Sequence, residues 1–116
     1  MTPQAFHDAC MALPAVTMTV QWGDDRVYKV GGKMFAVAGP GAGKGGYSFK
    51  ASDLAFEVMT ENGMAKPAPY LARAKWVWLE SLDDHDDAEV ADWLKTAHAL
   101  VAAKLTKAAR RDLELL

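Results

Sequence analysis

A glycine-rich segment, residues 39–46, is the part of the sequence closest to a phosphate-binding motif. Three of its glycines fit the spacing G-x-G-x-x-G, and Lys44 follows a glycine as in a phosphate loop. Both motifs bind phosphate with backbone N–H groups that lead into the N-terminus of a helix. Residues 47–50 instead alternate like a strand, and Gly45 stands where a phosphate loop has its magnesium-binding hydroxyl. We therefore interpret the segment as a flexible hairpin loop.

A run of acidic residues between 80 and 92 is the second candidate site. Carboxylates with an imidazole, here His85, can bind a divalent cation. Neighbouring residues of a chain point in different directions, however, and acids at a helix N-terminus are explained by capping and by the helix dipole. We expect neither a metal nor a cofactor at this run.

The residue types that serve as nucleophiles and bases form no recognisable catalytic pattern. His7, His85 and His98 share no zinc-like spacing, and no serine–histidine–acid triad can be assembled from sequence alone. Cys10, the single cysteine, lies on the apolar stripe of a predicted helix, which is typical of a buried and unreactive thiol. We expect no catalytic residues and no enzymatic activity.

Charge is distributed unevenly along the chain, although the formal net charge is only -2. Residues 26–50 and residues 95–111 each contain five basic residues and no acid, whereas residues 80–92 are strongly acidic. Such segregation can produce a basic face that attracts phosphate groups. The alternative is structural, because lysines protect sheet edges and cations stabilise the C-termini of helices.

Weak binding of nucleic acid, DNA in particular, through a basic surface is the leading hypothesis. The residues expected to contact it are Arg26, Lys29, Lys33, Lys50, Arg73, Lys75, Lys104 and Lys107, with Trp76 as a stacking platform. Strand residues of opposite parity face opposite ways, so Lys29 need not share a face with Arg26. The second hypothesis is a protein-interaction module that uses a face or an edge of a sheet. A small-ligand binder or an enzyme is third, and it requires a concave pocket with convergent polar groups.

The elements that must position these residues follow from caps, turns and periodicity. Thr2 and Pro3 predict the start of a helix, Gly31-Gly32 predicts a tight hairpin, and Ser52 caps a second helix that carries an apolar stripe. The predicted helices are 3–13, 53–61 and one from Asp86, with Glu89 as its capping-box partner, and a basic tail from 104 that is helical too. The predicted strands are 16–22, 26–30, 33–38, 47–50 and 71–80.

This order, α-β-β-β-β-α-β-α, predicts one two-layer α+β domain over residues 1–116, with a mostly antiparallel sheet and helices on one face. Hydrophobic residues make up 51% of the chain, which is enough for a core without disulfides. No signal peptide and no membrane-spanning stretch is recognisable. We expect a cytoplasmic monomer that does not bind membranes.

Several segments resemble those of MmcQ/YjbR-like proteins. Residues 12–16 resemble the leucine-proline-glycine-valine run near the start of that family. Residues 22–36 are similar to its tryptophan-glycine pair and its "KVGGKIFA"-like hairpin. Residues 49–50, 75–76 and 100–105 correspond to its leucine-lysine, lysine/histidine-tryptophan and "LVxxKL" segments. The resemblance extends over nearly the whole chain.

The resemblance implies a compact two-layer α+β fold, similar to frataxin-like and type III secretion-chaperone-like folds. Members of the family are commonly labelled DNA-binding, so the resemblance implies a nucleic-acid partner. It provides no catalytic residues. The sequence departs from the family in two places, at Ala15, where a glycine is usual, and in the longer glycine-rich loop at 39–46.

Overall fold

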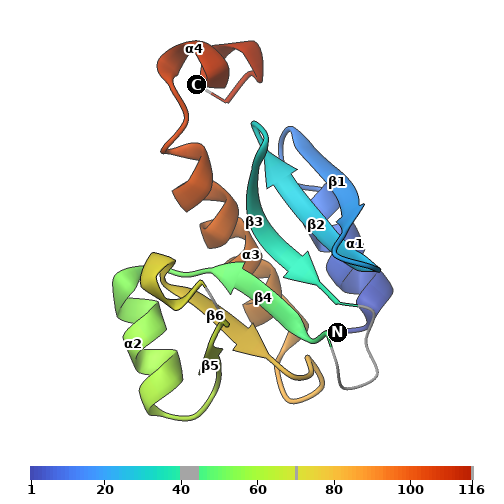
Figure 1. Ribbon diagram of the computed structural model, residues 1–116, viewed down its shortest axis with the longest axis vertical. Helices are drawn as coiled ribbons and strands as arrows, with labels where there is room; N and C mark the ends of the chain where they lie inside the picture. Colours follow the sequence, from blue (N-terminus) through green and yellow to red (C-terminus); the bar gives the residue numbers. More distant parts are fainter. Residues whose placement is uncertain (40–44, 70, 116) are drawn as a thin grey trace.

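The computed structural model describes residues 1–39, 45–69 and 71–115 (Figure 1). Its six-stranded antiparallel sheet has the strand order β1-β2-β3-β4-β6-β5. The strands are β1 (Val16–Gln21), β2 (Asp25–Val30), β3 (Lys33–Ala38), β4 (Tyr47–Lys50), β5 (Lys66–Pro67) and β6 (Trp76–Leu79). The helices are α1 (Pro3–Met11), α2 (Asp53–Glu61), α3 (Asp87–Ala102) and α4 (Lys107–Asp112), with a 3-10 turn, η1, at Ala72–Ala74. The predicted α+β class and the meander of the first four strands are confirmed.

The β2–β3 hairpin forms at the predicted glycine pair. Gly31 and Gly32 have φ angles of +58° and +80°, which residues with a Cβ rarely adopt. The predicted loop between β3 and β4 falls largely on residues 40–44, which lie outside the described part of the chain. At its two ends Gly39 N–H donates to Gly46 O at 2.9 Å, and a strand rather than a helix follows. The ends of this segment therefore have the geometry of a hairpin connection.

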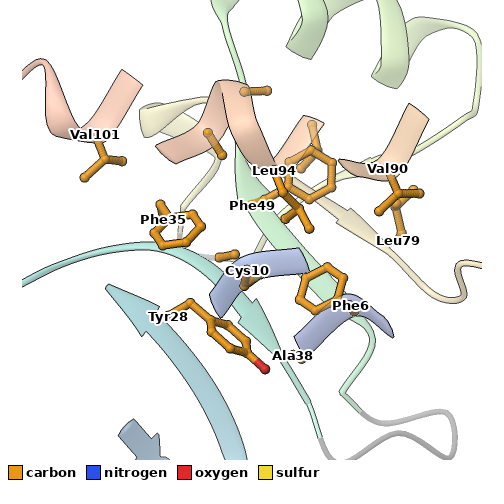
Figure 2. Close-up of a cluster of buried hydrophobic side chains, with 14 of the residues drawn as sticks. Phe6, Cys10, Tyr28, Phe35, Ala38, Phe49, Leu79, Val90, Leu94 and Val101 are labelled. Carbon is orange, nitrogen blue, oxygen red and sulfur yellow. The ribbon is translucent and has the colours of Figure 1, made fainter. Parts of the chain in front are cut away.

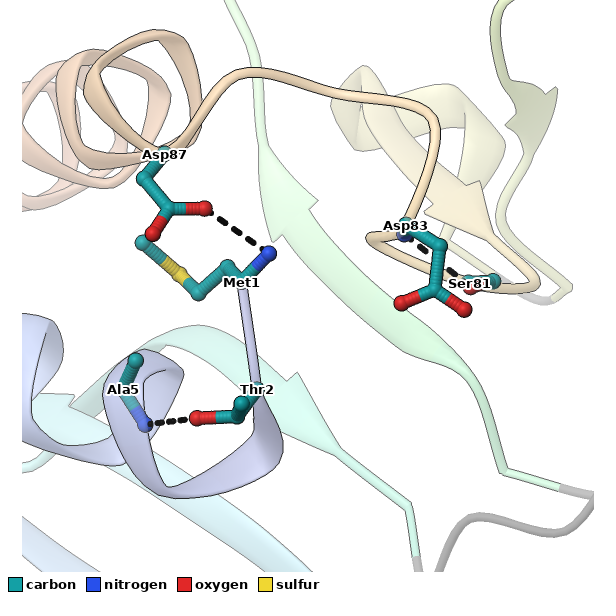
Figure 3. A network of polar contacts seen from close by, with 6 residues as sticks. All are labelled: Met1, Thr2, Ala5, Ser81, Asp83 and Asp87. Carbon is teal, nitrogen blue, oxygen red and sulfur yellow. Dashed lines mark hydrogen bonds and ion pairs between the residues drawn. The ribbon is translucent and has the colours of Figure 1, made fainter.

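Side-chain caps begin three of the four helices. Thr2 Oγ1 accepts a hydrogen bond from Ala5 N–H at 3.0 Å, and Ser52 and Thr106 make the equivalent bonds at 3.1 and 3.0 Å. Asp86 is the residue that precedes α3, as predicted, but the predicted capping hydrogen bond is wrong, because the Asp86 side chain makes none. Instead the N-terminal amine of Met1 lies 2.8 Å from Asp87 Oδ1 and joins the starts of α1 and α3 (Figure 3).

The core lies between one face of the sheet and the helices. Strand alternation turns Tyr28, Phe49 and Leu79 toward α1 and α3, which supply Phe6 and Leu94 among others (Figure 2). All five of these side chains are buried. Helix α3 covers β3 and β4, and α2 packs near β5 and β6 (Figure 1). Helices on one face of an antiparallel sheet are the two layers that the sequence predicts.

The last predicted strand is shorter than expected. It begins at Trp76 instead of Leu71, because η1 precedes it and Lys75 has a φ of +62°, which turns the chain out of extended geometry. The loop predicted around the two prolines contains the short strand β5 at Lys66–Pro67. Strand β5 lies at the end of the strand order, where a proline without N–H is tolerated.

The apolar stripe predicted for α2 is only partly buried. Met59 lies in the core, but Leu54 is 72% exposed and Val58 is 50% exposed. Helix α2 packs against the two short strands at one side of the sheet, so a narrower part of its surface is covered than the sequence pattern predicts.

Ala15 occupies a left-handed conformation, with φ +59°, which residues with a Cβ rarely adopt. We expect Ala15→Gly to raise the free energy of unfolding by about 1 kcal/mol. A left-handed L-residue costs about 1–2 kcal/mol, and the greater freedom of glycine in the unfolded chain offsets part of that gain. Urea denaturation followed by circular dichroism measures the change.

Ala12→Gly is the matched control for this prediction. Ala12 has a φ of -75°, an ordinary right-handed conformation, so it has no strain that glycine could relieve. We expect this variant to be less stable than the parent by about 0.5–1 kcal/mol. A loss of stability in both variants contradicts the strain assigned to Ala15.

None of the described helices is both long enough and apolar enough to cross a lipid bilayer.

Candidate functional site

Three of the predicted lysines lie at the same end of the sheet because of strand direction. Lys33 begins β3, Lys50 ends the antiparallel neighbour β4, and Lys75 immediately precedes β6, which runs antiparallel to β4. Lys50 is the register partner of Trp76, and Ala51 N–H donates to Lys75 O at 2.9 Å. Side chains far apart in the sequence are thus brought to one place by backbone pairing.

The C-terminal part of the chain reaches this end as well. Leu105 packs against the β2–β3 turn so closely that a Cβ on Gly31 would lie 2.6 Å from its Cδ1. The end of α3 is therefore held beside the turn, and Lys104 and Lys107 are carried there with it. Figure 1 shows α4 beyond the same end of the sheet.

Lys50 is the centre of this group. Its ammonium donates a hydrogen bond to Ala74 O. Burial lowers the pKa of Lys50, the positive charges of Lys104 and Lys75 lower it further, and Asp53 acts in the opposite direction. Lys104 and Lys75 are thus close enough to Lys50 for their positive charges to act on it.

We call this cluster the basic end of the sheet. It consists of six of the residues predicted from sequence, namely Lys33, Lys50, Arg73, Lys75, Lys104 and Lys107. Lys50 and Lys75 are half-buried and the other four are exposed. Lys75 also places its ammonium 5.1 Å from the centre of the Phe56 ring, which limits its freedom.

Two of the predicted basic residues lie elsewhere. Lys29 pairs with Met34 on the sheet face opposite the helices. Arg26 lies near the start of β2, at the far end of the sheet, in a hollow with Asp24 and Tyr28. The parity argument is confirmed, because Arg26 and Lys29 point to opposite faces.

Trp76 does not present a stacking platform. It is only 4% exposed, at the start of β6, where it is the register partner of Lys50. The exposed tryptophan is Trp22, at 64%. The sequence predicts that Trp22 continues the first strand, but β1 ends at Gln21 and Trp22 has a φ of +52°. The glycine that follows Trp22 is the sequence signal for this turn.

Acidic residues gather at the opposite end of the sheet. The β1–β2 turn, the end of β6 and the start of α3 all lie there, because each of these elements has its other end at the basic end. These segments carry Asp24, Asp25, Glu80, Asp83, Asp84, Asp86, Asp87 and Glu89. The uneven charge of the sequence becomes a separation of charge along the strands.

Residues with acid–base or nucleophilic chemistry make structural contacts. His7 Nδ1 lies 2.9 Å from Tyr28 Oη, and His98 Nε2 lies 2.7 Å from Pro14 O. Burial raises the pKa of Tyr28 to about 12. Cys10 is buried as predicted, and burial raises the pKa of its thiol. Within the ranges that the structure describes, no three potential metal-ligating side chains come together.

Comparison with known proteins identifies relatives of this chain. The YjbR family model matches residues 11–100. A crystal structure of the Deinococcus radiodurans protein DR2400, domain DUF419, is similar at 25% sequence identity with a TM-score of 0.86. The similarity covers 99% of this chain and 89% of that one. No curated protein matches the chain.

Proposed function

The chain belongs to the YjbR family, and we propose that it binds nucleic acid weakly through the basic end of its sheet, without catalysing a reaction. The observation that carries the proposal is that six basic residues lie at one end of a protein whose net charge is -2. Two of them, Lys75 and Lys104, are near enough to Lys50 for their charges to lower its pKa in addition to burial. Clustered cations attract phosphates by releasing the counterions bound to the nucleic acid.

The separation of charge supports an oriented approach. The acidic end repels phosphates while the basic end attracts them, so the protein meets a polyanion in a preferred orientation. Burial and the positive charges of Lys104 and Lys75 lower the pKa of Lys50, and a phosphate beside the Lys50 ammonium would offset that repulsion.

Binding without catalysis is supported by the environment of the reactive residue types. His7 and His98 are held in hydrogen bonds to other parts of the fold, and Cys10 is buried on the core-facing side of α1. We also propose that the domain is a cytoplasmic monomer; its single cysteine is free and buried, which is compatible with a reducing compartment.

The test is fluorescence anisotropy with a labelled duplex and with its single strand, repeated between about 50 and 200 mM salt. Affinity should fall linearly in a log–log plot. We expect Lys50→Glu combined with Lys104→Glu to weaken binding at least tenfold at the lowest salt. The salt slope should fall by about 2, one for each lost phosphate contact.

The matched control is Lys66→Glu combined with Lys95→Glu. It makes the same change in net charge on exposed side chains of β5 and α3 that lie outside the basic end. This variant should retain most of the affinity and the parental salt slope. Absence of binding at low salt, or equal losses in both double variants, contradicts the proposal.

The alternative function is protein interaction, and the edge of the sheet favours it. Strand β1 ends the strand order, and Thr17, Thr19 and Val20 are exposed on it. Such an edge can accept an added strand from a partner. If the titration shows no nucleic-acid binding, β1 is the surface on which a partner peptide should be sought.

A further inference from the structure

The sheet face opposite the helices contains a groove of about 500 Å³. Its floor is made by Met34 and Val37 from β3 and by Ser48 from β4. Val37 and Ser48 are register partners, so the floor runs across two neighbouring strands. The volume lies within the range of pockets that hold small molecules.

Two loops form the walls of the groove. Trp22 and Asp25, from the β1–β2 connection and the start of β2, make one wall. Pro69 and Leu71, which precede η1, make the other. Chain segments about fifty residues apart thus enclose the same space, and most of its lining is apolar.

Trp22 is held in this wall in an uncommon backbone conformation. Its φ of +52° is rare for a bulky residue, and Gly23 beside it has a φ of +90°. The turn keeps the indole 64% exposed above the groove. An exposed indole provides a flat face that attracts both aromatic rings and cations.

The polar groups of the lining determine the charge of the occupant. Asp25 is the one ionisable side chain among the described residues that line the groove, and Ser48 adds a hydroxyl. A carboxylate beside an indole face is complementary to a positively charged nitrogen. Lys29 pairs with Met34 on the same sheet face, so its positive charge disfavours a cation near Met34. The charged group of a ligand is therefore favoured near Asp25, and the apolar part of that ligand is favoured near Met34 and Leu71.

We propose that the groove binds a small organic cation of the arylalkylamine class. The ammonium pairs with Asp25 and contacts the face of Trp22, and the ring lies over Val37 against Leu71. This site is separate from the basic end, so it does not depend on nucleic-acid binding.

The test is an NMR titration of the full chain, labelled with ¹⁵N, with 2-phenylethylammonium. The neutral 2-phenylethanol and the anionic 3-phenylpropionate are compared with it. The indole N–H signal of Trp22, assigned by its loss in Trp22→Phe, should shift most with the ammonium. We expect the ammonium to bind about 3- to 10-fold more tightly than the alcohol, and the anion to bind most weakly.

Asp25→Asn should remove the difference between ammonium and alcohol while leaving the affinity for the alcohol unchanged. Asp24→Asn is the matched control, because Asp24 lies in the hollow with Arg26 and Tyr28 rather than in this groove. That variant should retain the full preference for the ammonium. Equal affinities for the three probes, a preference for the anion, or shifts confined to signals outside the groove overturn the proposal.

Discussion

Phe6→Ala should lower the free energy of unfolding by about 3–5 kcal/mol, the cost of emptying the space of a buried aromatic ring. Phe6 is 0% exposed and lies on α1, with its ring centre 6.0 Å from that of Tyr28 and 4.9 Å from that of Tyr47. It is the side chain that fixes α1 to the sheet. Because domains are stable by only about 5–15 kcal/mol, the variant should unfold at a markedly lower urea concentration.

Leu54→Ala is the control for this prediction. Leu54 is on α2 and 72% exposed, so its truncation should change the free energy of unfolding by no more than about 0.5 kcal/mol. Urea denaturation followed by tryptophan fluorescence measures both variants. A loss below about 1 kcal/mol for Phe6→Ala would show that α1 is not packed on the sheet in solution.

The second large effect is expected at the β2–β3 turn. Gly31→Ala should destabilise the protein by about 3 kcal/mol, because it combines a left-handed alanine with a collision against Leu105. Gly32→Ala also has a positive φ, but nothing lies within 4 Å of its added Cβ, so a loss of about 1–2 kcal/mol is expected.

The difference between these two variants measures the contact between the turn and Leu105. Repeating both in a Leu105→Ala background completes a double-mutant cycle. In that background Gly31→Ala and Gly32→Ala should have nearly equal effects. If the difference persists, Leu105 is not what limits space at Gly31, and the placement of Lys104 at the basic end loses its support.

The sequence predicts those structural elements that depend on interactions between residues close together in the chain. The cap at Thr2, the glycine pair at 31–32 and the alternation along β2 and β3 each act within a few residues, and each is confirmed. The predicted start of β6 is wrong because Lys75 has a left-handed conformation, which lysine rarely adopts, so the sequence carries no signal for this turn. The sequence does not predict the exposed side of α2, because its burial depends on which strands the helix covers. Helix α2 packs against β5 and β6, which are short.

The candidate site is predictable in composition but not in arrangement. The sequence shows which residues are basic, and strand parity predicts that Lys29 need not share a face with Arg26. Their gathering depends on the strand order and on where α3 ends, and both are tertiary properties. The groove beside Trp22 could not be predicted either, since its walls come from two loops whose meeting no local pattern encodes.

The hydrogen bond between His98 and Pro14 joins residues 84 positions apart, so it can form only after most of the chain has been synthesised. Strands β1 to β4 are complete at residue 50, whereas α3, which covers them, ends at residue 102. At about 5–20 residues per second, the ribosome needs about 3 to 10 seconds to make the intervening segment. During that interval Phe35 and Phe49 lack the α3 side chains that they pack against, His98 and Trp93. The nascent meander therefore exposes apolar surface that α1 alone does not cover, and this surface is buried only when α3 emerges.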